Sequence, residues 1–144
     1  MISLKSYMNY WEGIAATFKE DVDVMPVTLD DAMANKIQQI RTGRTTLFIL
    51  PPSASADARD VDNFKERCPC VLFLLKKFDP QRSNSWSTLE ETQPLMEAIK
   101  RRMVEDQAAG CPLMQVDVAS FNTQAETQFF AGFAGWSLGF TVKS

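Results

Sequence analysis

The end of the chain, residues 128–143, constrains the fold more than any other stretch. It reads QFFAGFAGWSLGFTVK, and small or polar residues alternate there with large apolar ones at Trp136, Leu138, Phe140 and Val142. A period of two places these four side chains on one face, as in a half-buried β-strand. Because such a strand builds the end of the chain into a sheet, we expect the fold to need the full length.

Length and composition indicate one soluble domain. The chain has 144 residues, the usual size of a single domain, so we expect one domain over residues 1–144. The net charge of -3 argues against a nucleic-acid-binding protein, which usually carries a basic excess. The longest apolar run, residues 71–75, is too short to span a bilayer, and no targeting segment is recognisable. We therefore expect a cytoplasmic protein that is not secreted and does not enter a membrane.

Two stretches near the N-terminus have the apolar spacing of amphipathic helices. Residues 3–19 carry a stripe at three- and four-residue steps, formed by Leu4, Met8, Trp11, Ala15 and Phe18. Residues 28–41 begin with a threonine N-cap and two aspartates, and Gly43 is placed to end that helix in the left-handed conformation. Residues 20–26 are expected to be a connector.

Two apolar runs predict buried strands, over residues 45–50 and 70–76. The second run is continuous rather than alternating, so we expect it to be central and covered on both faces. Between the two, residues 51–67 are expected to form a long flexible loop, and loops of this length are usually functional or mobile.

A third helix is expected from Thr88 to about Gln107, because Thr88, Leu89, Glu90 and Glu91 match a capping box. Pro94 lies inside this stretch and predicts a kink or a later start. A strand is expected over residues 113–119, with Met114, Val116 and Val118 on one face, and a polar stretch then leads to the final strand.

The predicted order is helix, helix, strand, strand, helix, strand, strand. Such an order indicates an α+β domain, and we expect a mostly antiparallel four-stranded sheet with the helices packed on one face.

No set of residues in the sequence resembles the machinery of an enzyme. There is no histidine, no glycine-rich phosphate loop and no nucleophile elbow. Cys68 and Cys70 are interpreted as small hydrophobes entering a buried strand rather than half of a zinc site, which needs four ligands. Asp57, Asp60 and Asp62 match a calcium loop only in part and are interpreted as a solvated loop. We expect no enzyme, no cofactor and no metal.

Three groups of residues are candidates for protein contacts. The aromatic residues Phe129, Phe130 and Phe133 adjoin glycines just before the final strand; core packing is the favoured reading and an interface the alternative. The basic cluster Lys100, Arg101 and Arg102 lies near a helix C-terminus, where the helix dipole already favours cations. The three aspartates of the 51–67 loop form the last group.

The order of elements and the final strand resemble the small tail-terminator and tail-completion proteins of tailed bacteriophages and prophages. The matching residues are Gly135, Trp136, Leu138, Phe140 and Val142, after a helix at 88–107 and a central strand at 70–76. The resemblance implies a non-catalytic homo-oligomeric ring that caps the tail tube and meets the head connector. It places the protein in the bacterial cytoplasm during assembly and then in the virion, with loop 51–67 as a contact element ordered on assembly.

Two other readings stay open. A small cytoplasmic α+β domain of bacterial origin that binds a small molecule would have a closed pocket with convergent polar groups. An adaptor would bind another protein through the aromatic segment at residues 128–135.

Overall fold

The computed structural model describes residues 2–28, 31–56, 66–111, 115–127 and 132–143. In chain order their elements are α1 (Leu4–Ala16), β1 (Val22–Pro26), α2 (Asp31–Gln38), β2 (Thr45–Ile49), β3 (Ser55–Ala56), β4 (Glu66–Lys77), α3 (Ser85–Ala108), β5 (Val116–Glu126) and β6 (Phe133–Lys143). This is the α+β class that the sequence predicts.

The strands form one mixed sheet in the order β1-β2-β4-β6-β5. β1 and β2 are parallel, the other neighbours in this order are antiparallel, and short β3 pairs with the start of β4. The prediction of four strands was wrong because residues 20–26 contain β1 rather than only a connector. The sequence of β1, VDVMP, carries an aspartate and ends in proline, features typical of an edge strand rather than of a buried one.

The two strands with the clearest sequence signal lie side by side at the centre of the sheet. β4 lies between β2 and β6, as expected for a central strand, and is longer than the predicted 70–76. In β6, Leu138, Phe140 and Val142 belong to the larger core cluster, and Trp136 packs against it. Ser137, Gly139 and Thr141 face the other way, which confirms the predicted alternation.

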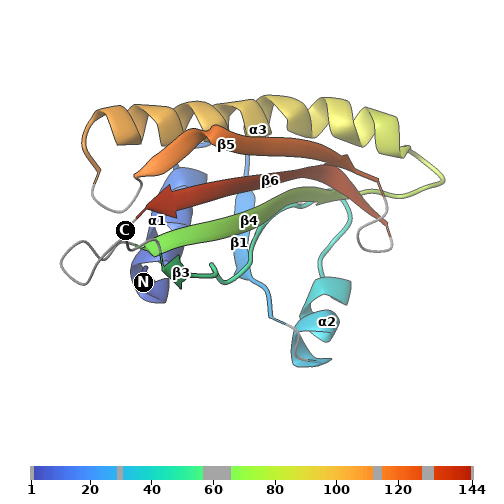
Figure 1. The fold of residues 1–144 in the computed structure, drawn as a ribbon. Coiled ribbons are helices and arrows are strands. Elements are labelled where there is room, and N and C mark those ends of the chain that lie inside the picture. Colours follow the sequence, from blue (N-terminus) through green and yellow to red (C-terminus); the bar gives the residue numbers. More distant parts are fainter. Residues whose placement is uncertain (1, 29–30, 57–65, 112–114, 128–131, 144) are drawn as a thin grey trace.

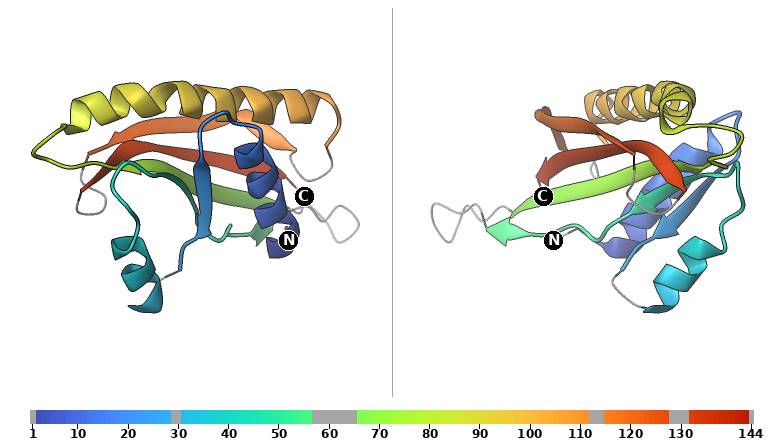
Figure 2. Two further views of the ribbon diagram at one scale, coloured as in Figure 1. Left: turned by 180° about the vertical axis from the view of Figure 1, so that it is seen from behind. Right: turned by 90° about the vertical axis from the view of Figure 1, so that its right-hand side faces the viewer.

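The helices cover both faces of the sheet, not one as predicted. α1 and α3 pack on one face, where they enclose the larger core; its members include Trp11, Leu47, Leu74, Ile99 and Phe140. α2 lies on the opposite face, where Ile37 joins a second cluster with Phe48, Phe73, Leu75 and Phe133. Figures 1 and 2 show α3 lying along the sheet and α2 projecting from its other side. Hydrophobic spacing along a helix does not reveal which face of a sheet the helix covers, so the sequence could not separate the two positions.

α1 begins where predicted, with the Ser3 side chain accepting a hydrogen bond from the Ser6 amide at 3.3 Å. Its buried face is rotated from the predicted stripe: Tyr7, Trp11, Ile14 and Ala15 are buried, whereas Leu4 is 57% exposed. Tyr7 and Ile14, which are not members of the predicted stripe, therefore belong to the core.

α3 begins three residues before the predicted capping box. Asn84 is the N-cap, and its Oδ1 accepts a hydrogen bond from the Ser87 amide at 2.8 Å. Thr88 is instead buried in the first turn, where its hydroxyl donates to the Asn84 carbonyl. The helix continues through Pro94 as one element to Ala108, near the predicted end.

β5 runs through the polar stretch that was expected to lie between two strands. Its pairing with β6 shifts register between Asp117 and Asn122, which marks a bulge or irregularity. Val116 is buried but Val118 is 45% exposed, so the predicted shared apolar face stops at the irregularity. Residues 113 and 114 of the predicted strand lie outside the described residues.

The predicted loop at 51–67 includes β3 and the first residues of β4. Its aspartates, at 57, 60 and 62, lie outside the described residues. The predicted helix at 28–41 is shorter, spanning Asp31–Gln38, and Gly43 adopts the expected positive φ of 89°.

Gly135 lies directly against the backbone of the neighbouring strand β4. A Cβ atom at this position would lie 2.0 Å from the backbone oxygen of Leu74 and 2.9 Å from the Cα of Leu75. Since neither backbone atom can move without shifting β4, only glycine allows β6 to pair with β4 here.

Candidate functional site

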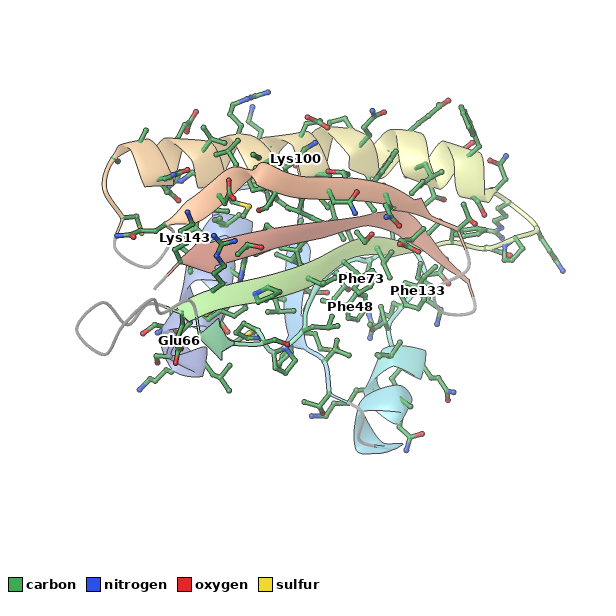
Figure 3. The ribbon with its side chains drawn as sticks, in the orientation of Figure 1. Phe48, Glu66, Phe73, Lys100, Phe133 and Lys143 are labelled. Atoms are coloured by element: carbon green, nitrogen blue, oxygen red, sulfur yellow. The ribbon has the colours of Figure 1, made fainter. Side chains whose placement is uncertain are left out.

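Phe133, one of the predicted interface residues, belongs to the core. Its ring is 2% exposed and meets Phe48 edge to face, with ring centroids 6.0 Å apart. Figure 3 shows Phe48, Phe73 and Phe133 close together on the α2 side of the sheet. The core-packing alternative therefore holds for Phe133, while Phe129 and Phe130 lie outside the described residues.

The basic cluster of α3 divides into three different environments. Lys100 pairs with Glu97 on the same helix at 2.9 Å. Arg102 pairs with Asp106 at 3.0 Å, and Asp106 also accepts a hydrogen bond from the Tyr10 hydroxyl at 2.7 Å. Burial and this hydrogen bond raise the pKa of Tyr10 above its usual value. Arg102 thus supports the contact between α3 and α1, whereas Arg101 is an exposed residue of the helix.

A stripe that the sequence reading missed runs along the outer side of α3. Trp86 is 72% exposed and Val104 is 40% exposed. They are 18 residues apart, which is five helical turns of about 3.6 residues, so they share one face. Glu97 and Lys100 lie between them on this face. We call these four residues the outer stripe.

Trp86 stands out among the exposed side chains of the described residues. Its indole nitrogen donates a hydrogen bond to Glu90 one turn later, at 2.5 Å, which holds the ring on the helix surface. A large, oriented and solvent-exposed tryptophan is typical of protein-binding surfaces. The signal was in the sequence, but the helix was expected to begin at Thr88, two residues after Trp86.

A second exposed apolar position lies on the same sheet face as α2, in a part of that face that α2 does not cover. Val71 in β4 is 38% exposed, and its antiparallel partner in β6 is Gly139, which has no side chain to cover it. Pro69 is exposed two residues earlier on the same face. We call Pro69, Val71 and Gly139 the Val71 patch.

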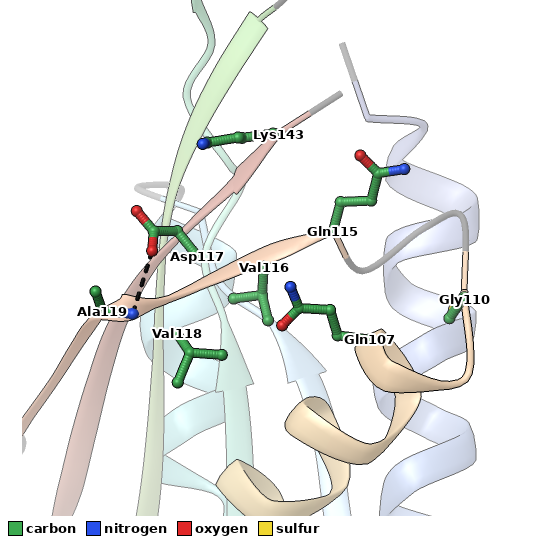
Figure 4. A pocket seen from close by; sticks show the side chains of 9 residues that line it. Gln107, Gly110, Gln115, Val116, Asp117, Val118, Ala119 and Lys143 are labelled. Carbon is green, nitrogen blue, oxygen red and sulfur yellow. Dashed lines mark hydrogen bonds between the residues drawn. The ribbon is translucent and has the colours of Figure 1, made fainter.

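A hollow of about 550 Å³ lies where α3 ends and β5 begins. Gln107 of α3 reaches toward β5, whereas Asp117 and Lys143 belong to the opposite face of the sheet from Val116 (Figure 4). Asp117 also accepts a hydrogen bond from the Ala119 amide at 3.2 Å. Because the polar side chains point in different directions, they do not form the convergent set that a small-molecule site requires.

The two cysteines of the CPC sequence are part of the larger core, as predicted. Cys68 is 1% and Cys70 is 3% exposed, and the Cys70 thiol donates to the Cys68 carbonyl at 3.2 Å. Burial raises the pKa of Cys70 to about 11, so its thiol stays protonated at neutral pH. Within the described ranges, no three His, Cys, Asp or Glu side chains are grouped so that they could hold a metal ion.

Among the described helices, none is both long and apolar enough to cross a membrane. No protein-family model matches the chain, and no curated protein matches its sequence.

Proposed function

We propose that the protein is a structural, non-catalytic component of a phage or prophage tail. In this proposal it assembles with copies of itself into a ring at the tail end or at the head–tail junction, beside tail-tube or head-connector proteins. The resemblance of the final strand and of the element order to tail-terminator and tail-completion proteins suggests the family. The fold class and the buried final strand are compatible with it.

The single observation that carries self-assembly is the exposure of Trp86 on the outer stripe. Burying a tryptophan of this exposure against a second protein removes a large apolar area from water, a contribution that often dominates an interface. α3 is also anchored next to Trp86, since Thr88, Leu89 and Thr92 are buried on its inner side. A rigid helix presents such a residue at little cost in conformational entropy.

A ring requires two different surfaces on each copy, because its contacts are head-to-tail. The outer stripe supplies one surface of the proposed contact. The Val71 patch supplies the other, since it lies on the sheet face opposite α3 and exposes a second large apolar side chain. Each copy would then contact one neighbour through Trp86 and the other neighbour through Val71.

Size-exclusion chromatography with light scattering tests this proposal, on the protein alone and mixed with a tail-tube protein. We expect concentration-dependent oligomers, alone or with the tube protein, that Trp86→Ser abolishes. Leu4→Ser is the matched control, because it removes another exposed apolar side chain, 57% exposed against 72% for Trp86, from α1. A strict monomer at high concentration that also fails to bind a tail-tube protein would refute the proposal.

Mixing two variants tests whether the contact is head-to-tail. Trp86→Ser and Val71→Ser each disable one surface, so each protein alone should be monomeric. A mixture of the two should form a heterodimer, in which the intact Trp86 of one variant meets the intact Val71 of the other. A mixture that stays monomeric would show that these two surfaces do not face each other.

A further inference from the structure

The outer edge of the sheet at β1 has a groove beside it. A hollow of about 390 Å³ lies between the end of α1 and β1, and its apolar lining includes Ala15, Ala16, Phe18, Val22 and Val24. β1 is the last strand on this side, so within the described residues no strand pairs with its outer edge. The left view of Figure 2 shows β1 at this edge with α1 beside it.

The backbone of β1 offers hydrogen-bonding groups to this groove. The Val27 amide donates to the Ile49 carbonyl of β2 at 2.8 Å, so residue 27 points its backbone groups inward. Backbone groups of successive residues in a strand alternate in direction, so residues 25 and 23 also point toward β2. Val22 and Val24 consequently direct their N–H and C=O groups away from the sheet, where another strand would pair with them.

The groove is apolar at its base and acidic at its rim. Glu12, Glu20, Asp21 and Asp23 belong to the lining. Arg44 contacts two of these carboxylates, with one nitrogen 2.7 Å from Asp23 and another 3.5 Å from Asp21. These contacts raise the pKa of Arg44, which keeps its charge. Four carboxylates and one guanidinium leave a net charge of -3, which favours a cationic occupant.

We propose that this groove binds an extended, basic segment of another protein as an additional strand next to β1. Strand addition at a free edge obtains affinity from main-chain hydrogen bonds and specificity from alternate side chains. On one face the segment meets the apolar flank of α1, so those positions are apolar. On its other face the segment meets Asp23, so the residues that alternate with the apolar ones are lysine or arginine.

This proposal does not depend on ring formation, because the outer stripe lies on α3 and the Val71 patch lies on β4 and β6, outside the lining of the groove. It concerns a different polypeptide, and another copy of this chain is a poor match. β5, the strand at the other free edge of the sheet, carries Asp117 and Glu126 and would add negative charge to an acidic groove.

The test uses a short peptide of alternating valine and lysine with blocked ends, added to the full-length protein at low salt. Amide hydrogen exchange, measured by NMR, is the primary readout. We expect the peptide to slow exchange at Val22 and Val24, whose amides point outward. A peptide in which valine alternates with glutamate, and a lysine peptide methylated on alternate backbone nitrogens, should both leave these amides unprotected.

A matched pair of charge reversals locates the binding site. Glu12 on α1 and Glu105 on α3 are both exposed helical glutamates, but only Glu12 lines the groove. Glu12→Lys should weaken binding of the lysine peptide about tenfold. As a free energy, this loss is about twice the effect of removing one surface ion pair. Glu105→Lys should leave the affinity within about twofold.

Any of four results would overturn the proposal. The first is failure of the lysine peptide to bind. The second is binding without protection of Val22 and Val24, and another is an equal loss of affinity for the two charge reversals. The last is concentration-dependent protection of Val22 and Val24 in the protein alone, which would identify the occupant as a second copy.

Discussion

The two faces of the sheet hold cores that differ in how they are built. On one face, α1 and α3 each contribute three buried residues to the core cluster, and β2, β4, β5 and β6 contribute most of the others. On the other face, Ile37 of the eight-residue α2 shares a cluster with four buried side chains of the sheet, as far as the described residues go. The core on the first face is built from most elements of the chain, whereas the cluster on the second face mainly attaches α2 to the sheet.

This difference should divide the stability of the molecule into two levels. Residues whose contacts involve many elements are lost only when the whole domain unfolds, whereas a short helix held by few contacts opens on its own. Variants on the α1–α3 face should therefore lower global stability, and variants on the α2 face should mainly release α2.

The largest effect is expected from Trp11→Ala on the α1–α3 face. Trp11 is 0% exposed and meets Tyr7, Tyr10 and Phe140 edge to face. The change leaves a large cavity and should cost about 3–5 kcal/mol of unfolding free energy, measured by urea denaturation. The control, Trp86→Ala at the exposed position, should change stability by no more than about 0.5 kcal/mol. Equal losses for both variants would contradict the assignment of the core.

Phe133→Ala on the α2 face should cost about 3 kcal/mol, at the lower end of the range for a buried phenylalanine. The smaller loss is expected because α2 can shift to fill part of the space left by the ring. Urea denaturation gives the magnitude, and hydrogen exchange shows where the structure loosens. If Phe133 were an interface residue instead, the domain would keep its full stability.

Alkaline pH should destabilise the α1–α3 face selectively. Burial raises the pKa values of Tyr7 and Cys70, so both groups bind their protons more tightly in the folded state than in the unfolded state. This stability is fully present below the unfolded pKa of a cysteine, about 8.5, and is lost as pH rises toward the folded value. Between about pH 9 and the folded-state pKa of about 11, Cys70 alone should cost up to about 1.4 kcal/mol per pH unit.

Urea midpoints measured between pH 7 and pH 11 test this expectation. Cys70→Ala should flatten the decline that begins near pH 9. Phe133→Ala, on the other face, should lower every midpoint but leave the slope unchanged. A slope that Cys70→Ala does not alter would show that the thiol ionises as readily in the folded chain as in the unfolded one.

The smallest effect is expected at Lys77, which ties α2 to the sheet. Its ammonium donates to the Ile40 carbonyl at 2.8 Å and to the Gln38 carbonyl at 3.3 Å, and lies 5.9 Å from the Phe133 ring centre. Lys77→Met should cost about 1 kcal/mol and speed amide exchange in α2 only. Lys76→Met is the control, because the neighbouring side chain points to the other face and pairs with Glu91. Faster exchange in α2 with Lys76→Met would contradict the separation of the two faces.

The sequence predicted the centre of the sheet well and its edges poorly. β4 and β6 are buried strands, so continuous or alternating apolar residues dominate their sequences. β1 and the second half of β5 lie at edges, where half of each strand contacts water and polar residues are tolerated. An exposed edge strand therefore reads like a connector, as residues 20–26 and 120–127 did.

The candidate site was harder to predict because exposure is a property of the whole fold. Phe133 and Trp86 are both aromatic residues near an element's start, yet one is 2% and the other 72% exposed. Trp86 was missed because the start of α3 was misplaced. Asn84 caps the helix, although Thr88 and Glu91 also fit a capping pattern. Two overlapping caps compete in such a sequence, and tertiary packing of Thr88 favours the earlier one.

Gly135 has a consequence for how this chain can vary over time. Any side chain at that position meets the backbone of Leu74 and Leu75, and the only relief is to separate the two strands at the middle of the sheet. Mutation can therefore replace most core residues of this domain in small steps, by exchanging one apolar side chain for another of similar shape. At position 135, no other residue type fits without separating the strands. In a collection of diverged sequences with this fold, that glycine should be the last residue to change, and a search for distant relatives can be anchored on it.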